Sequence, residues 1–388
     1  MKKYFFSLGT NESLSLAELQ SLFPNNSWQK YDSVAISDFE EEIIPKDLIA
    51  RLGGTIKIGE IIKEVNLANR HALSDSVKKI IISLAKENYI SGKYNFGFSF
   101  YNKKIPGDFF KLGLAIKKEL KNLNISSRMV TSRESILSSV VVEQNKLVSG
   151  GTEICFISTK NKILIGQTLA VQPFKELSKR DFGRPNRDDF SGMIPPKLAQ
   201  IMINLARSND KKFYDKLFLD PFCGSGTIIM EAYLMGFKNI IGSDLSDKAV
   251  NDSQKNMEWI IDLKKKNISD INMTIFQSDV LKIEDRLKEN SISYIVCEPY
   301  LGPARGFQDF SKIVVDLNRF YSEALFIFER LLKHDGRIVM IWPHFRTTKE
   351  AWKVKPEIGK LKMLSIGVYG RSEQKVWREI IVLKKSDF

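Results

Sequence analysis

The chain of 388 residues is 43% hydrophobic and 11% aromatic, which is typical of a globular protein with two or three cores. No apolar run approaches the ~18 to 20 residues of a membrane helix, and the opening MKKYFFSLGTNESLS has too few apolar residues for a signal peptide, so we expect a cytoplasmic protein with no membrane span. The three cysteines and three histidines lack metal-ligand spacing, which predicts neither a metal site nor a disulfide framework.

The net charge of +13 favours a polyanionic partner such as nucleic acid. Its distribution is uneven, because residues 1–50 carry 4 Lys and Arg against 8 Asp and Glu, whereas residues 51–150 carry 17 against 8. Residues 51–150 are therefore the expected polyanion-binding region, with solvated lysine-rich surfaces as the alternative.

Two small α+β domains are expected in the first half of the chain, because short strands and helices alternate there. Residues 1–65 suit a ferredoxin-like domain, with strands at 3–9, 33–37 and 55–65 and helices at 14–24 and 45–54. Residues 66–170 suit a second compact domain, with helices at 74–87 and 108–124 and strands at 93–101, 152–159 and 162–172. The proline-rich, charged segment that follows, 171–190, is predicted to be a linker.

Strands and helices alternate again from 191 to 388, which predicts a doubly wound, mostly parallel α/β sheet with its ligands at the carboxyl ends of the strands. Helices are expected at 197–206, 227–236, 247–263 and 314–332. Strands are expected at 216–220, 239–244, 272–279, 292–299 and 336–343, followed by an antiparallel pair at 361–370 and 375–385.

The first of these strands runs into the sequence LFLDPFCGSGTIIMEA. Gly224 and Gly226 allow a tight turn and close approach of a ligand, and the helix that begins near Thr227 directs its amides at that ligand. The pattern is neither GxGxxG nor a P-loop, which argues against a nucleoside triphosphate. Asp220 at the head of the loop suits a cationic group and would repel a phosphate.

Two further acids, Asp244 and Asp279, end the next two strands, so three carboxylates form a row along one edge of the sheet. Each acid alone is more often a cap or turn residue. S-adenosylmethionine carries an amino group, a ribose diol and an adenine amine in a row of donors, so the set predicts this cofactor. The predicted cofactor-binding residues are Asp220, Phe222, Gly224, Gly226, Asp244, Leu245, Asp279 and Val280.

The motifs DPFCGSGT, GSD, QSD and CEPY, with the upstream RDFGRPNRDDFSGMIPPKLAQIMINLA, resemble the THUMP-domain class I RNA methyltransferases, above all the archaeal-type tRNA guanine-10 N2-methyltransferases. The resemblance is specific over 190–388 and weaker before it. It implies a Rossmann-like class I methyltransferase domain with a C-terminal antiparallel strand pair at 191–388, preceded by ferredoxin-like (1–65) and THUMP-like, RNA-binding (66–170) modules. It also implies tRNA as the partner.

Enzymes of this family methylate an exocyclic amine through a loop of the form DPPY, where this chain has CEPY. Two registers are open. In one, Cys297 occupies the acceptor position and is a poor acceptor. In the other, which we favour, Glu298 accepts from the amine, Pro299 is retained and Tyr300 stacks on the base. Phe307 and Phe310 either line the base pocket or pack against the following helix.

RNA contacts are predicted on two basic stretches. One is a loop with Arg180, Arg184 and Arg187, for which salt bridges to Asp181, Asp188 and Asp189 are the alternative. The other surrounds the expected helix at 108–124, where solvated lysines are the alternative. The RNA-binding residues predicted from both stretches are Lys103, Lys104, Lys117, Lys118, Lys121, Arg184 and Arg187.

The leading hypothesis is therefore a tRNA methyltransferase that acts on guanine N2. Another guanine, an adenine N6 or a protein glutamine amide is the alternative within the same class, and the basic region at 51–150 argues against the protein substrate. An RNA-binding homologue that has lost catalysis is the alternative from another class. The sequence leaves open a small activating protein subunit.

Overall fold

The structure is a computed structural model, which describes residues 1–67, 69–101, 105, 107–188, 193–264, 271–303, 309–347, 350–370 and 374–385. The chain forms two compact units. Unit 1 consists of Met1–Glu12 and Asn25–Phe174, and unit 2 of Ser13–Pro24 and Lys175–Phe388.

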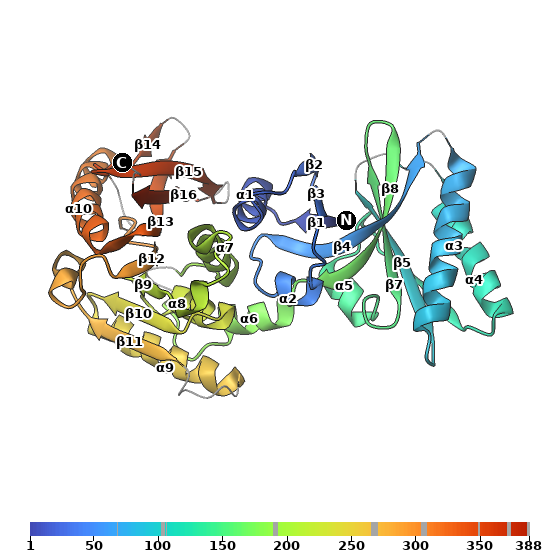
Figure 1. Ribbon diagram of the computed structural model, residues 1–388, viewed down its shortest axis with the longest axis horizontal. Helices are drawn as coiled ribbons and strands as arrows, with labels where there is room; N and C mark the ends of the chain where they lie inside the picture. Colours follow the sequence, from blue (N-terminus) through green and yellow to red (C-terminus); the bar gives the residue numbers. More distant parts are fainter. Residues whose placement is uncertain are drawn as a thin grey trace. The chain divides into compact units, whose positions relative to one another are not determined.

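Unit 1 is built on one eight-stranded mixed sheet with the strand order β2-β3-β1-β4-β8-β7-β5-β6 (Figure 1). Its strands are β1 (Lys2–Leu8), β2 (Gln29–Tyr31), β3 (Val34–Phe39), β4 (Thr55–Asn66), β5 (Tyr94–Tyr101), β6 (Ser127–Val130), β7 (Thr152–Ser158) and β8 (Lys162–Val171). Its helices are α2 (Pro45–Ile49), α3 (Arg70–Asn88), α4 (Phe109–Asn122) and α5 (Ser139–Gln144). The expected strands and helices of the first half are confirmed as elements.

The core of unit 1 forms where α3 and α4 cover one face of this sheet (Figure 1). Alternate residues of β5, such as Phe96 and Phe98, belong to one buried cluster with Val77 and Ile81 of α3 and Ile116 of α4. The strands β2-β3-β1-β4 are all antiparallel to their neighbours, as a ferredoxin-like module requires, but they continue into the same sheet through the β4–β8 pair. The ferredoxin-like and THUMP assignments, and the boundary at 65, stay predictions.

Unit 2 contains a seven-stranded path, β11-β10-β9-β12-β13-β16-β15, with β14 paired to β13. Its strands are β9 (Leu217–Asp220), β10 (Asn239–Asp244), β11 (Asn272–Gln277), β12 (Ile292–Cys297), β13 (Leu332–Arg346), β14 (Ala351–Lys353), β15 (Leu361–Tyr369) and β16 (Val376–Lys385). The first five strands of the path run parallel, and β13–β16 and β16–β15 are antiparallel. The doubly wound sheet with a C-terminal antiparallel pair is confirmed.

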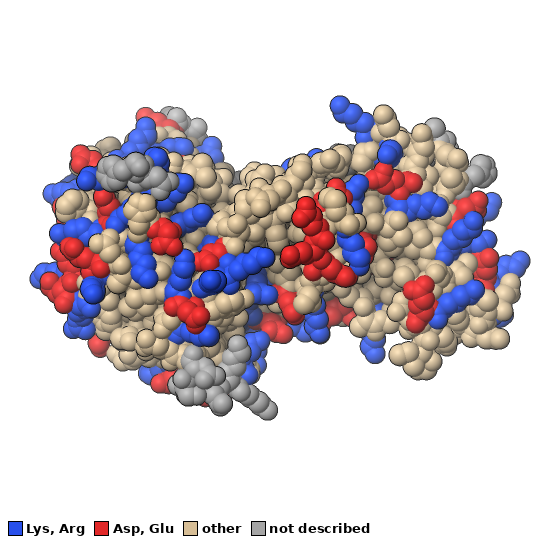
Figure 2. Space-filling view, in the orientation of Figure 1, with Lys and Arg blue, Asp and Glu red and all other residues tan. Residues whose placement is uncertain are grey.

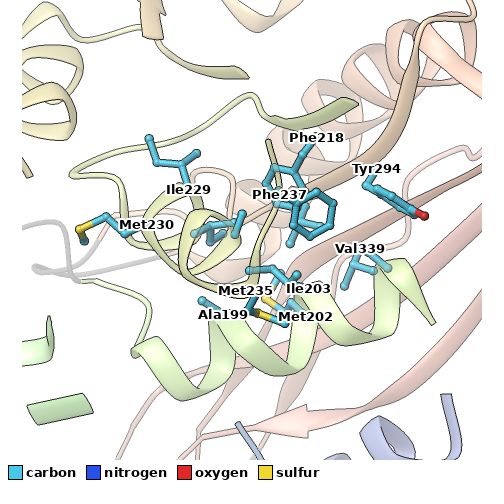
Figure 3. Packing of buried hydrophobic residues seen from close by; sticks show 14 of the residues in the cluster. Ala199, Met202, Ile203, Phe218, Ile229, Met230, Met235, Phe237, Tyr294 and Val339 are labelled. Carbon is cyan, nitrogen blue, oxygen red and sulfur yellow. The ribbon is translucent and has the colours of Figure 1, made fainter. Parts of the chain in front are cut away.

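Helices cover both faces of this sheet. They are α1 (Glu12–Leu22), α6 (Phe174–Phe182), α7 (Pro196–Arg207), α8 (Thr227–Met235), α9 (Asp247–Lys264) and α10 (Phe310–Leu331), with short 3-10 turns η1 (Phe213–Asp215) and η3 (Val280–Asp285). The α7, α8 and α9 helices build one core, and α10 with η3 builds the other. Figure 3 shows Met202 and Ile203 of α7 directed toward the cluster around Phe218 and Phe237.

The α1 helix belongs to unit 2, although the strands before and after it in the chain belong to unit 1. Leu14 of α1 is fully buried in the core that contains α7. Asn204 of α7 donates from Nδ2 to Oε1 of Glu18 at 2.7 Å, and both side chains are inaccessible to solvent. A buried polar group on α7 thus has its partner on α1.

Where we predicted a linker at 171–190, the structure has α6. Arg180 on this helix is 5% exposed and donates to both carboxylate oxygens of Glu231 on α8, at 2.6 and 3.1 Å. Burial raises the pKa of Glu231, and Arg180 opposes that shift. The prolines and charges that resemble a linker therefore include a helix fixed to unit 2 by a buried ion pair.

Candidate active site

A pocket of about 690 Å³ lies in unit 2 where the parallel strands end. The loops after β9, β10, β11 and β12 all contribute to its lining. This is the edge at which a doubly wound sheet binds its ligands. The structure thus brings together the predicted pocket residues Asp220, Phe222, Gly224, Asp244, Leu245, Asp279, Val280, Glu298, Pro299 and Tyr300.

The glycine loop takes its shape from two left-handed residues, Gly224 at φ +51° and Gly226 at φ +87°. A Cβ atom on Gly226 would lie 2.6 Å from Oγ of Ser253, so a side chain at this position would force Ser253 to shift. Asn256 of α9, which is fully buried, donates to the carbonyl oxygen of Ser225 at 2.8 Å. The loop is therefore held from α9 as well as by its own turn.

Asp220 ends β9 and is 1% exposed. One oxygen accepts from the backbone amide of Phe222 at 3.1 Å, and the other, Oδ2, accepts no hydrogen bond from the residues that the structure describes. Burial raises the pKa of this carboxyl well above its usual range, and the neighbouring Asp244 and Glu298 raise it further. A cationic donor would satisfy the oxygen and the charge together, so this residue fits an ammonium group.

Asp244 shapes the loop as well as the pocket. Its Oδ2 accepts from the Gly224 amide at 2.9 Å and its Oδ1 from the Ser246 amide at 3.0 Å. A carboxylate has about four acceptor sites, so two bonds leave capacity for a hydroxyl pair. Asp279 accepts from the Leu281 amide at 3.0 Å and caps η3. Both acids thus act as turn or cap residues and also line the pocket.

The end of β12 separates the two registers of the CEPY loop. Cys297 is fully buried in the core beneath α10, where burial raises the pKa of its thiol. Glu298, Pro299 and Tyr300 line the pocket instead. Tyr300 is 59% exposed, and its carbonyl oxygen accepts from the Tyr321 hydroxyl at 2.7 Å. This arrangement favours Glu298 over Cys297 as the acceptor.

Arg378 of β16 is a pocket residue that the sequence did not reveal. Its Nε donates to Oε1 of Glu298 at 2.5 Å, and the two side chains are 16% and 14% exposed. Both line the pocket, 80 positions apart in the chain. Asn256 was missed for the same reason, since a lone Asn or Arg far along the chain carries no local signal.

The predicted basic loop is largely built into the protein. Arg184 is 3% exposed and donates to the Thr227 hydroxyl at 2.5 Å and to the Met193 sulfur at 2.8 Å. Its burial removes Arg184 from the RNA-binding residues that we propose. Arg187 is half-buried, with its guanidinium 5.3 Å from the centre of the Phe182 ring. The alternative, salt bridges to the neighbouring aspartates, is also wrong for Arg180, because its salt-bridge partner is Glu231.

The lysines of the other basic stretch are exposed where the structure describes them. Lys117, Lys118 and Lys121 lie on the outer side of α4, while Lys103 and Lys104 lie outside the described residues. On the face in Figure 2, Lys and Arg alternate with Asp and Glu over both units and form no single basic patch.

Two aromatic predictions have different outcomes. Phe307 lies outside the described residues. Phe310 is 7% exposed and stacks on Phe345 with ring centres 4.9 Å apart, so it belongs to the core under α10.

The described part of the chain has no helix long and apolar enough to span a membrane. Across the same residues, no cluster of three His, Cys, Asp or Glu side chains could hold a metal ion, and all three cysteines are buried free thiols.

The fold defines the class of protein. The crystal structure of TrmN from Thermus thermophilus has a TM-score of 0.53 against this chain at 15% identity, over 100% of both chains. Together with the strand order of unit 2, this likeness shows the α/β fold of class I methyltransferases.

The family follows from sequence matches. The family described as RMKL-like, methyltransferase domain, matches residues 184–368. The family described as DNA methylase matches residues 57–255, just over half of the chain. The chain belongs to this DNA methylase family of methyltransferases. The matched residues include the glycine loop and end before Glu298.

Archaeal relatives are named tRNA (guanine(10)-N2)-dimethyltransferase. The protein of Methanothermobacter thermautotrophicus is 30% identical over 48% of this chain and 48% of its own length. That of Pyrococcus abyssi is 26% identical over 59% of this chain and 62% of its own length. The chain thus matches about half to three fifths of these relatives.

Proposed function

We propose that the protein is an S-adenosylmethionine-dependent methyltransferase that modifies the exocyclic N2 of a guanosine in cytoplasmic tRNA, at position 10 as the names of its relatives indicate. The observation that carries the proposal is the buried Asp220 carboxylate, whose free oxygen lies in the same pocket as the Glu298–Tyr300 loop. One carboxylate in the pocket can pair with a cationic ligand group, and the other can accept a hydrogen bond from an amine. This combination suits a sulfonium methyl donor and an amine that receives the methyl group.

The residues fit this cofactor. Asp220 would accept from its amino group, Asp244 from its ribose hydroxyls and Asp279 from its adenine amine, with the glycine loop allowing close approach. When bound, S-adenosylmethionine supplies a methyl group on a positively charged sulfur. Everything else must come from the protein.

The loop after β12 would prepare the nucleophile. The lone pair of an exocyclic amine is delocalised into the ring, so the amine needs orientation and an acceptor more than a strong base. Glu298 would accept a hydrogen bond from the amine and take its proton, and the exposed ring of Tyr300 would stack on the base. The ring of Pro299 fixes its backbone φ angle, which limits how the side chains of Glu298 and Tyr300 on either side can move relative to each other.

Unit 1 would position the folded RNA. Its predicted ferredoxin-like and THUMP modules contain the exposed residues Lys117, Lys118 and Lys121 of α4, which suit contacts with phosphates. With Arg184 removed, the proposed RNA-binding residues are these three lysines, Arg187, and the predicted Lys103 and Lys104.

The test is incubation of the full chain with S-adenosylmethionine labelled in its methyl group and unmodified tRNA, followed by digestion to nucleosides. We expect the label in N2-methylated guanosine. Glu298→Ala should lower the rate by about 100-fold or more, since an acceptor for the reacting amine is worth ~10² to 10⁴-fold. Glu289→Ala, which changes an exposed loop residue before β12, is the matched control.

Three results would contradict parts of the proposal. Absence of label in every RNA and in duplex DNA would reject the enzyme. Duplex DNA is tested as well, because the matched family is described as DNA methylase. Label in duplex DNA but not in tRNA would reject the RNA substrate. Equal rates for Glu298→Ala and wild type would reject the role of Glu298 alone.

A further inference from the structure

The Glu298–Arg378 pair joins a strong acceptor and a strong donor at one place in the pocket. The only bond that either side chain makes within the described structure is the one between Oε1 of Glu298 and Nε of Arg378. Oε2 of the carboxylate and both terminal nitrogens of the guanidinium therefore keep their full hydrogen-bonding capacity. Both side chains are about 85% buried and line the pocket, so the groups left without a protein partner are available to a ligand there.

We propose that this pair reads the Watson–Crick edge of the target guanine, an inference that rests on the proposed function. Glu298 accepts from the N2 amine and from N1–H, and Arg378 donates to O6.

The order of groups supports this assignment. Along the guanine edge the sequence is the N2 donor, the N1 donor and the O6 acceptor. Along the pair it is Oε2, then Oε1, then the guanidinium that binds Oε1. The two acceptors and one donor of the protein pair thus face the two donors and one acceptor of guanine, in the same order. Adenine presents an unprotonated N1, which would oppose a carboxylate oxygen, so the same pair rejects adenine.

The position of Arg378 also fits this role. It lies near the start of β16, which runs antiparallel to β13, so its side chain is at the same sheet edge as the ends of the parallel strands. Its register partners are Pro343 of β13, which lacks a side-chain donor or acceptor, and Tyr369 of β15. A flat, rigid guanidinium suits a carboxylate on one side and a carbonyl oxygen on the other.

The experiment compares two RNAs that differ only at the target nucleotide, one with guanosine and one with 2,6-diaminopurine riboside. The second keeps the reacting N2 amine but replaces N1–H by an acceptor and O6 by an amine. Wild type should prefer guanosine in kcat/KM. Arg378→Ala should lower kcat/KM for the guanosine RNA by about 10- to 100-fold and for the other RNA by less than about 3-fold, so that the preference narrows.

Two further variants separate base reading from support of Glu298. Arg378→Lys keeps the charge beside the carboxylate but not the planar fork, so it should leave the preference narrowed. Arg346→Ala, at the end of β13 and outside the pocket lining, is the matched control and should keep the wild-type preference. S-adenosylmethionine binding, measured by calorimetry, should change by less than about 3-fold in all three variants, because none of them removes a residue that we propose binds the cofactor. A larger change would indicate a lost hydrogen bond to the cofactor or a disturbed fold.

The failures are distinguishable. If wild type methylates neither RNA, the proposed function fails. If wild type methylates guanosine and Arg378→Ala loses rate on both RNAs alike, or keeps the wild-type preference, base reading is overturned while the proposed function stands. If Arg378→Ala loses cofactor binding, the preference of Arg378→Lys decides, and full wild-type preference there overturns the inference.

Discussion

At the scale of single residues, Asp220 contributes to the pH dependence of the stability of the ligand-free protein. Its pKa is raised in the folded state, so the folded protein binds this proton more tightly than the unfolded chain does. The stability that this group contributes is full below the unfolded pKa of about 3.9 and is lost as pH rises through the raised folded pKa.

Asp220→Asn should therefore stabilise the ligand-free protein at pH 7, by about 1–3 kcal/mol, because the amide keeps the bond from Phe222 without a buried charge. The gain should vanish near pH 4. Urea unfolding at both pH values measures it. The same variant should bind S-adenosylmethionine at least about 10-fold more weakly in calorimetry. Equal destabilisation at both pH values would contradict the charge-based explanation.

Much of the site could be predicted from the sequence, because acids and glycines directly after apolar strands must gather at one sheet edge. Asp220, Asp244, Asp279 and Glu298 all line the pocket for this reason. Arg378 could not be predicted, because its place depends on the register of an antiparallel strand 80 positions after Glu298. Arg184 lies in a basic stretch that is typical of phosphate contacts, but tertiary packing buries it, so its side chain bonds within the protein instead.

At the scale of elements, the two glycines before α8 give a matched pair of substitutions. Gly224 and Gly226 both have positive φ, but a Cβ on Gly224 would meet nothing within 4 Å, whereas one on Gly226 would meet Ser253. Gly224→Ala should cost about 1–2 kcal/mol of unfolding free energy from backbone strain alone. Gly226→Ala should cost about 2–4 kcal/mol, since overpacking adds to the strain.

Chemical denaturation of both variants, with cofactor affinity measured in parallel, checks this difference. Gly236→Ala, at the other end of α8 with φ +107°, is a useful third variant because it lies away from the pocket lining. It should destabilise without a specific loss of affinity. Equal costs at Gly224 and Gly226 would show that the contact with Ser253 is relieved, by rotation of its side chain or by movement of α9, and adds nothing to the strain.

The strands and helices themselves could be predicted, because apolar periodicity and turn residues mark most of them. The sheet partners could not. The pairing of β4 with β8, which makes one sheet of unit 1, depends on edges that no local pattern reveals. The helix α6 was hidden by prolines and charges, because the buried pair of Arg180 and Glu231 fixes it only in three dimensions.

At the scale of the whole molecule, the charge of +13 should appear in the salt dependence of tRNA binding. Neutralising Lys117, Lys118 and Lys121 together should lower the slope of log affinity against log salt by about 2–3, since each phosphate contact contributes ~0.7–0.9. Filter binding at several salt concentrations measures the slope. Replacing the exposed residues Lys333, Lys360 and Lys362 removes the same charge from unit 2 and is the control. Equal slopes for both triple variants would reject α4 as a contact surface.

The placement of α1 in unit 2 has a consequence for protein synthesis. Glu18 leaves the ribosome 186 positions before its partner Asn204, a delay of about 10–40 s at ~5–20 residues per second. During that time the strands on either side of α1 can begin their own sheet. Leu14 and the apolar face around it stay exposed until α7 has been synthesised. Translation speed and holding chaperones should therefore influence how much of this protein reaches its native state.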